Sequence, residues 1–253
     1  MNNERERHLF VAWRRPDGLI VPVGRLTQYG TADQPSFQFV YLKVAERQDD
    51  FMALPGLPRL HQAYESSSLF PVFANRLMPR DRPDYPEFLE QLDLSAEADP
   101  FEVLERSEGV RVTDRVEVFP APHRTDDGLL STLFFARGIR HLERAAEAVA
   151  GVSAGDELTL EREPDNPVNE QAILMNTRTG QAVGWAPDYL LGLLYELRDL
   201  NGRWPTITAE HVNGLSTPAQ MRLLCRLTSE WPTGYEPFSG PDFQPLATPH
   251  TMA

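Results

Sequence analysis

Small polar side chains gather in one short run of the sequence, residues 162–173. Two prolines bracket Asp165 and Asn166 there, and Asn169 follows them. Strand-like stretches lie on both sides, so the run predicts a tight polar connection that holds hydrogen-bonding side chains at a strand end. These side chains could contact the polar end of a ligand. Because Asp and Asn also bond to their own backbone in turns, a purely structural role remains the alternative.

Other patterns that could indicate catalysis do not fit their surroundings. Residues 151–155 match the G-x-S-x-G pattern of a nucleophile elbow, but an Ala-rich helical stretch precedes it and a strand follows, which reverses the required order. The six histidines show none of the close spacings of a metal site, and Cys225 is the sole cysteine. We therefore predict no metal, no cofactor and no enzymatic activity, with Cys225 a buried structural thiol.

The elements around the polar run predict a small mixed barrel. Apolar alternation, helix-forming residues and turn residues mark them. We expect strands at 130–136, 157–162, 172–176, 182–186, 205–212 and 221–227, with helices at 142–150 and 187–200.

Three segments of this region resemble the HIRAN domain. They are Gly138-Ile139-Arg140-His141, Gly155-Asp156-Glu157-Leu158 and Val183-Gly184-Trp185-Ala186-Pro187, and the resemblance covers residues 131–228. It implies an OB-like HIRAN β-barrel with two helices. It also implies recognition of DNA, including single-stranded 3′ ends.

The resemblance carries over to the binding pocket only in part. Arg140 matches the family's pocket arginine, and Asn166 with Pro167 matches its Asn-Pro pair. His141 and Leu142 replace an aromatic pair, Val168 replaces a tyrosine, and Asn169 replaces the aspartate that meets the 3′ hydroxyl. Losing an aromatic platform costs about 1–3 kcal/mol per base. The predicted nucleic-acid-binding residues are Arg140, His141, Asp165, Asn166, Asn169 and Trp185.

Each of these residues also has a structural explanation. Arg140 could pair with the acidic surface of the chain instead of a phosphate. Trp185 and Tyr189 could be core aromatics that cover one end of the barrel. The sequence leaves these alternatives open.

The amino-terminal part predicts a separate, smaller α/β module. A V-G-R-L strand, an F-x-F strand, a Pro-rich stretch and the helix-like LFPVFANRL resemble the small amino-terminal subdomain of HipA-type kinases over residues 9–120. The chain leaves this region without a phosphate-covering loop or catalytic Asp, so we predict no kinase activity. The resemblance implies a protein-interaction or antitoxin-like module. Phe70, Phe73 and Leu77, at helical spacing, could equally be core residues.

Composition limits how nucleic acid could be bound. The formal net charge is −13 over 253 residues, and neither half has a basic excess. Phosphate contacts from Lys and Arg supply most non-specific affinity, so DNA binding would need a local basic pocket. The absence of a signal-like or membrane-spanning segment leads us to expect a cytoplasmic protein.

The predicted fold class is α+β, mainly β. The predicted organisation is a HipA-like module at 1–120, a linker at 121–131, a HIRAN-like domain at 132–230 and a Pro-rich tail at 231–253. The expected partner is single-stranded DNA or DNA ends, with a further protein partner for the amino-terminal module. The alternative is a protein-interaction regulator that no longer binds DNA.

Overall fold

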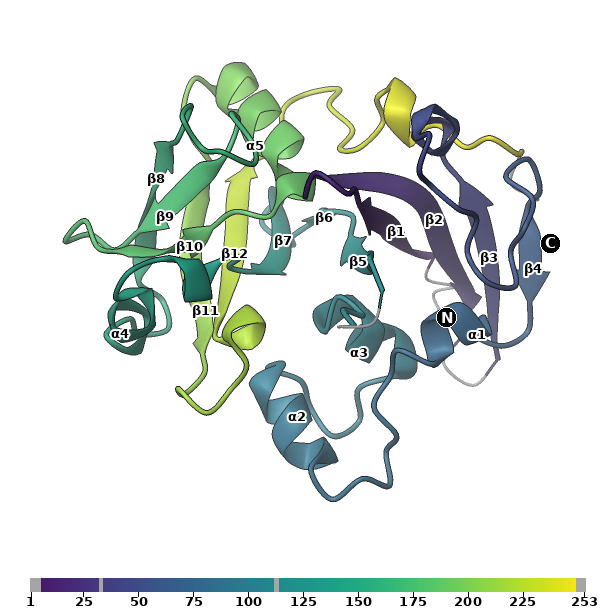
Figure 1. Ribbon diagram of the computed structural model, residues 1–253, viewed down its shortest axis with the longest axis horizontal. Helices are drawn as coiled ribbons and strands as arrows, with labels where there is room; N and C mark the ends of the chain where they lie inside the picture. Colours follow the sequence, from purple (N-terminus) through teal and green to yellow (C-terminus); the bar gives the residue numbers. More distant parts are fainter. Residues whose placement is uncertain (1–5, 32–33, 112–113, 249–253) are drawn as a thin grey trace. The chain divides into compact units, whose positions relative to one another are not determined.

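The computed structural model describes residues 6–31, 34–111 and 114–248. The chain divides into two compact units (Figure 1). The first unit comprises Met1–Pro86, Ser95–Ala121 and Phe238–Ala253, and the second comprises Glu87–Leu94 and Pro122–Pro237. Two antiparallel sheets and a few helices make this a mainly β, α+β protein, as predicted.

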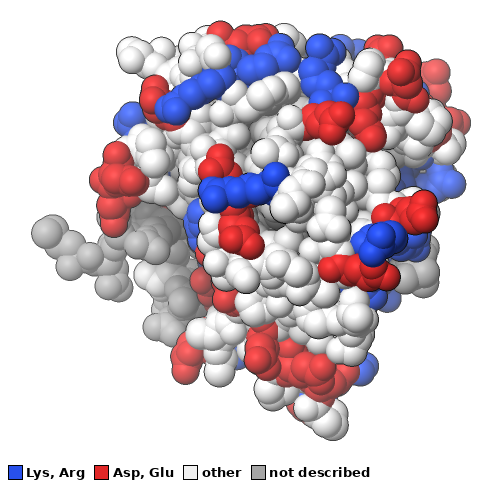
Figure 2. All heavy atoms as spheres, turned by 90° about the vertical axis from the view of Figure 1, so that its left-hand side faces the viewer, with Lys and Arg blue, Asp and Glu red and all other residues white. Residues whose placement is uncertain are grey.

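The helices and the charged surface of the structure fit the expectations drawn from composition. Within the described part of the chain, no helix is long and apolar enough to cross a membrane. Figure 2 shows basic side chains interspersed with acidic ones, with a row of basic side chains along its upper edge.

The first unit contains a five-stranded sheet in the order β4-β3-β2-β1-β5. The strands are β1 (Arg7–Arg14), β2 (Ile20–Gly30), β3 (Pro35–Tyr41), β4 (Tyr64–Ser66) and β5 (Val116–Pro120). A hairpin joins β1 to β2, and Gly18, at φ 99°, donates its N–H to Arg15 O at 3.1 Å in its turn. Positive φ is accessible to glycine at little cost, so the turn closes here.

Short helices accompany this sheet. They are the 3₁₀ turn η1 (Lys43–Arg47) and the α-helices α1 (Pro71–Ala74) and α3 (Pro100–Arg106). The helix α2 (Tyr85–Gln91) begins in this unit, and from Glu87 on it belongs to the second. Phe70 and Phe73 belong to the hydrophobic core, and Leu77 packs against it. Their helical spacing therefore reflects core packing.

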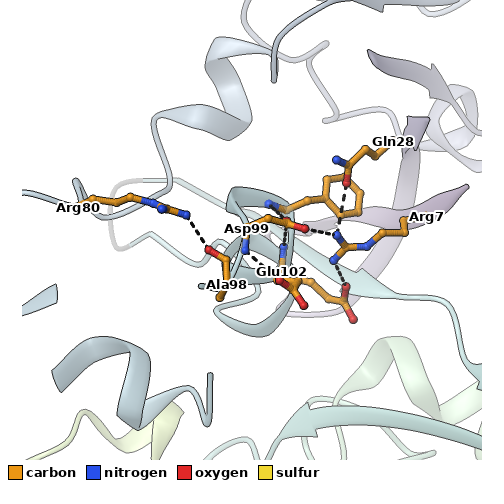
Figure 3. Close-up of polar contacts among 8 residues, drawn as sticks. Arg7, Gln28, Arg80, Ala98, Asp99 and Glu102 are labelled. Carbon is orange, nitrogen blue, oxygen red and sulfur yellow. Dashed lines mark hydrogen bonds and ion pairs between the residues drawn. The ribbon is translucent and has the colours of Figure 1, made fainter. Parts of the chain in front are cut away.

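Arg7 of β1 is tied to the start of α3 (Figure 3). Asp99 caps this helix, because its Oδ1 accepts hydrogen bonds from the backbone N–H groups of Phe101 and Glu102, both at 2.8 Å. The other oxygen, Oδ2, lies 2.7 Å from Nη1 of Arg7. A capping side chain contributes about 1 kcal/mol, and here it also links the helix to the sheet.

The carboxy-terminal segment packs on the first unit, with the turn η4 at Pro241–Phe243. Phe238 and Phe243 both lie 5.2 Å from the Phe10 ring, and Leu246 N–H donates to Tyr41 O at 2.8 Å. The part of the Pro-rich tail that begins at Phe238 therefore packs on residues of this sheet. Its last five residues lie outside the described residues.

The second unit contains a seven-stranded antiparallel sheet in the order β10-β9-β8-β11-β12-β7-β6. The strands are β6 (His123–Arg124), β7 (Leu129–Phe135), β8 (Glu157–Arg162), β9 (Ile173–Asn176), β10 (Ala182–Trp185), β11 (Thr206–Val212) and β12 (Leu223–Glu230). His123 pairs with Ser131, so part of the segment expected to be a linker lies in this sheet.

The predicted closed barrel is wrong. The sheet ends at β6 and β10, and a single bridge between Arg137 and Trp185 brings the chain after β7 to β10. The pairing stops there because Gly138 adopts a left-handed conformation, at φ 68°, and the chain enters a 3₁₀ turn.

Four helical segments complete this unit: η2 (Ile139–His141), α4 (Ala145–Ala150), α5 (Asp188–Asn201) and η3 (Ala219–Met221). The helix α4 begins three residues later than predicted, because Arg144 at φ 59° interrupts the helical backbone. A stripe of α5 is buried in the core and includes Tyr189, Leu190, Leu193, Leu194 and Leu197.

Candidate nucleic-acid interface

Trp185 lies at the end of β10, half-buried, and packs directly on Gly138. A Cβ added to Gly138 would come within 2.3 Å of Cε3 of the indole. The backbone groups of Arg137 and Trp185 exchange two hydrogen bonds, at 2.8 and 2.9 Å. The glycine therefore allows the close approach that fixes the indole beside the start of η2.

Glu163 connects Trp185 to the polar turn. Its Oε2 accepts a hydrogen bond from Trp185 Nε1 at 2.5 Å and another from Asn166 Nδ2 at 3.1 Å. Glu163 itself is held by the β8–β9 ladder, which continues one step past the strand through its N–H to Ala172 O at 3.0 Å. Hydrogen bonds to a charged group are among the strongest in proteins, so this carboxylate holds both partners in place.

The two asparagines organise the turn through their side-chain oxygens. Asn166 Oδ1 accepts from the N–H groups of Val168 and Asn169, at 3.0 and 3.2 Å, and Asn169 Oδ1 accepts from Gln171 N–H at 3.0 Å. Asn169 Nδ2 also donates to Asp188 Oδ1, at 3.1 Å, at the first residue of α5. These contacts are those of turn-forming residues, and they fix where the remaining polar atoms point.

Arg140 and His141 lie in η2, just after Gly138, and both are exposed. Arg140 Nε lies 3.0 Å from His141 Nε2. Arg140 forms no ion pair with any residue that the structure describes, so the expected alternative of pairing with the acidic surface is not seen there. Other arginines of this unit pair with carboxylates, as in Arg144–Glu147, Arg178–Glu157, Arg203–Glu230 and Arg226–Glu210.

The structure therefore connects some of the predicted site residues by hydrogen bonds or packing, and leaves others apart. Asn166 and Trp185 share Glu163, Asn169 belongs to the same turn, and Arg140 with His141 follows the glycine beneath the indole. Asp165 is exposed and contacts no other described residue through a hydrogen bond or ion pair. Whether these residues bind nucleic acid stays a prediction.

Glu163 was not among the predicted site residues. The available signal was its place directly before the first proline, at the end of a strand whose side chains alternate between faces. Nothing in the sequence showed that Trp185 would be its partner. The core alternative holds for Tyr189, which is buried, whereas the indole of Trp185 is half-exposed.

The fold and the residues around Trp185 and Glu163 define an α+β protein with a polar site that contains a half-exposed aromatic ring, on an antiparallel sheet. No family model and no curated protein matches the chain. A crystal structure of a protein from Lactobacillus plantarum is similar at 16% identity and a TM-score of 0.33, over 40% of this chain and 99% of that chain. The crystal structure of the HIRAN domain of human HLTF is similar at 21% identity and a TM-score of 0.30, over 42% and 81%.

These similarities are distant. At such identities and TM-scores they do not assign a family, so the HIRAN and HipA-like resemblances both stay predictions from the sequence.

Proposed function

We propose that the second unit binds single-stranded DNA or DNA ends, in the manner of a HIRAN domain and without catalysis. The observation that carries this proposal is the joining of Trp185, Asn166 and the η2 turn with Arg140 at one edge of the sheet. Single-strand binding combines an aromatic surface for bases with cations for phosphates, and both are present here.

The site residues can be given separate roles. The half-exposed indole of Trp185 offers a surface on which a base stacks, and the guanidinium of Arg140 offers a cation for a phosphate. Arg140 has no ion pair among the described residues, which answers the objection raised by the net charge of −13, because binding needs a local cation and not an overall excess.

The 3′ hydroxyl of the strand would be bound by Asn169 and Glu163. Both lone pairs of Asn166 Oδ1 are already used by backbone N–H groups. Asn169 keeps one lone pair and one N–H, and Oε1 of Glu163 has no hydrogen-bond partner among the described residues. A free 3′ hydroxyl can donate to either oxygen, whereas a terminal phosphate would be repelled by the carboxylate.

Fluorescence anisotropy with labelled oligonucleotides tests this function. We expect the chain to bind a single strand with a free 3′ end at low salt, and to bind a 3′-phosphorylated strand more weakly. Arg140→Gln should weaken binding and lower the slope of log K against log salt by about 0.7, the value for one phosphate contact on a single strand. Arg178→Gln, at an exposed arginine paired with Glu157, is the control.

A second candidate function is a protein-interaction or antitoxin-like role without DNA binding. The Glu163 carboxylate beside the indole favours it, since a negative charge next to the stacking surface opposes phosphate. No binding of either strand at low salt would reject DNA binding and leave this second candidate.

A further inference from the structure

A second cluster of aromatic and arginine side chains lies beside the same turn. The rings of Tyr195 in α5 and Trp204 after it are 5.3 Å apart, with planes at 63°. The guanidinium carbon of Arg198 lies 4.8 Å from both ring centroids. Arg162, the last residue of β8, lies 5.7 Å from the Tyr195 centroid. We call these four residues the α5 cluster.

The α5 cluster is not part of the hydrophobic core. Its rings are half-exposed, whereas the buried stripe of the helix is formed by Tyr189 and by leucines at other positions. Tyr195 is nevertheless fixed in place, because its hydroxyl donates to Gln171 O at 3.1 Å. The ring is thus held against the polar turn that also carries Asn166 and Asn169.

The two arginines of the cluster differ in their charge partners. Arg198 donates through Nε and Nη2 to Asp199 Oδ1, at 2.9 and 2.7 Å, which neutralises it. Arg162 is exposed and has no ion pair among the residues that the structure describes; its contact is with the Tyr195 ring. A guanidinium stacked on a ring keeps its N–H edges free, and those edges fit a phosphate.

Arg162 and Glu163 are adjacent, so their Cα atoms are about 3.8 Å apart. Their side chains reach different aromatic residues: Glu163 contacts Trp185, and Arg162 contacts Tyr195. A ligand that reaches both must pass over the end of β8.

We propose that the α5 cluster is a second contact site for the same single strand of DNA, with Arg162 on a backbone phosphate and the exposed part of the Tyr195–Trp204 pair against a base. This rests on the proposed function. In this arrangement the end of the DNA strand lies at Trp185, and the rest of the DNA continues over the end of β8 to the α5 cluster.

Strands of two lengths separate the two sites. A strand of about three nucleotides reaches the Trp185 site, and one of about twelve, within the range of about 4–16 per OB-type domain, reaches both. We expect Arg162→Gln to weaken binding of the longer strand by at least about fivefold and to lower its salt slope by about 0.7. Binding of the short strand should change by less than about twofold, as measured by titration calorimetry.

Conservative and matched variants identify the contact. Arg162→Lys keeps the charge but loses the planar fork, so it should keep the salt slope while losing part of the affinity. Arg178→Gln, also exposed at a strand end, should leave both strands unaffected. Trp204→Phe should remove the fluorescence quenching that the longer strand adds to that of the short one.

The outcomes are distinguishable. If the longer strand binds and Arg162→Gln leaves its affinity and salt slope unchanged, the α5 cluster is not a contact site. Equal losses for both strands would place Arg162 at the Trp185 site and overturn the second site. If the unaltered chain binds neither strand at low salt, the proposed function fails and this inference fails with it.

Discussion

Oε2 of Glu163 accepts a hydrogen bond from the indole Nε1 of Trp185 at 2.5 Å. The carboxylate comes from the end of β8 and the indole from the end of β10, two strands separated in the sheet by β9. The same oxygen accepts from Asn166, so one negative charge sets the position of the aromatic surface and of the polar turn. Under the proposed function, this charge would oppose a strand that ends in a phosphate.

Glu163→Gln should reduce discrimination between strand ends. The amide keeps an acceptor for Trp185 and Asn166 but removes the negative charge. For charges about 7 Å apart in water the repulsion is roughly 0.6 kcal/mol, so binding of a 3′-phosphorylated strand should improve about threefold. Binding of the free 3′ hydroxyl should not improve. Fluorescence anisotropy with both strands measures the ratio.

Glu157→Gln serves as the control, because this exposed carboxylate pairs with Arg178 away from the turn. Unchanged discrimination in Glu163→Gln would show that its carboxylate does not face the strand end.

Gly138→Ala should displace Trp185. The new Cβ would lie 2.3 Å from Cε3 of the indole, and an alanine at φ 68° adds left-handed strain of about 1–2 kcal/mol. We expect the free energy of unfolding to fall by more than this strain alone, with a change in near-ultraviolet circular dichroism.

Gly180→Ala isolates the backbone contribution. Gly180 has φ 81° and nothing within 4 Å of the added Cβ. It should lose only the strain energy in urea unfolding and leave the aromatic signal unchanged. Equal losses of unfolding free energy in the two variants would mean that moving the indole does not destabilise the folded chain.

Tyr41→Phe should destabilise the first unit by about 1–3 kcal/mol in urea unfolding, because it leaves buried backbone groups unpaired. The hydroxyl donates to Leu57 O at 2.8 Å and accepts from Leu54 N–H at 2.7 Å. Tyr64→Phe, whose hydroxyl bonds to the exposed Arg59 N–H, is the control and should cost less.

Tyr41 also predicts a dependence on alkaline pH. Burial raises the pKa of Tyr41 to about 12, above its ordinary value of 10.0. The folded chain therefore holds this proton more tightly than the unfolded chain, and the stabilisation is complete below pH 10 and lost as the pH rises towards 12. Tyr41→Phe should lose less stability than the unaltered chain over that interval. A parallel decline in both would contradict the assignment.

Cys225 should be unreactive in the folded chain. It is fully buried in β12, and burial raises the pKa of its thiol. The thiolate is the reactive form, so a thiol reagent at pH 8 should label it only after unfolding. Full labelling in urea is the control, and rapid labelling without denaturant would show that the strand opens readily.

Local patterns in the sequence determined most of the elements. The strand 157–162 has the predicted bounds, and α5 begins and ends within one residue of its prediction, because alternation, turn residues and prolines act over a few neighbours. The same patterns located Asn166 and Asn169 in a turn. They could not show which residues the side-chain amides of Asn166 and Asn169 would hydrogen-bond.

The sequence by itself thus determined the order of the strands along the chain and the polar turn. Only the tertiary structure decided that the sheet stays open, that Glu163 joins Trp185 to Asn166, and that Arg162 meets Tyr195. The contact between Glu163 and Trp185 joins residues 22 positions apart, and the contact between Arg162 and Tyr195 joins residues still further apart in the chain; both follow from the backbone direction at Gly138 and from packing. A pattern of a few neighbouring residues does not predict contacts between residues so far apart in the sequence.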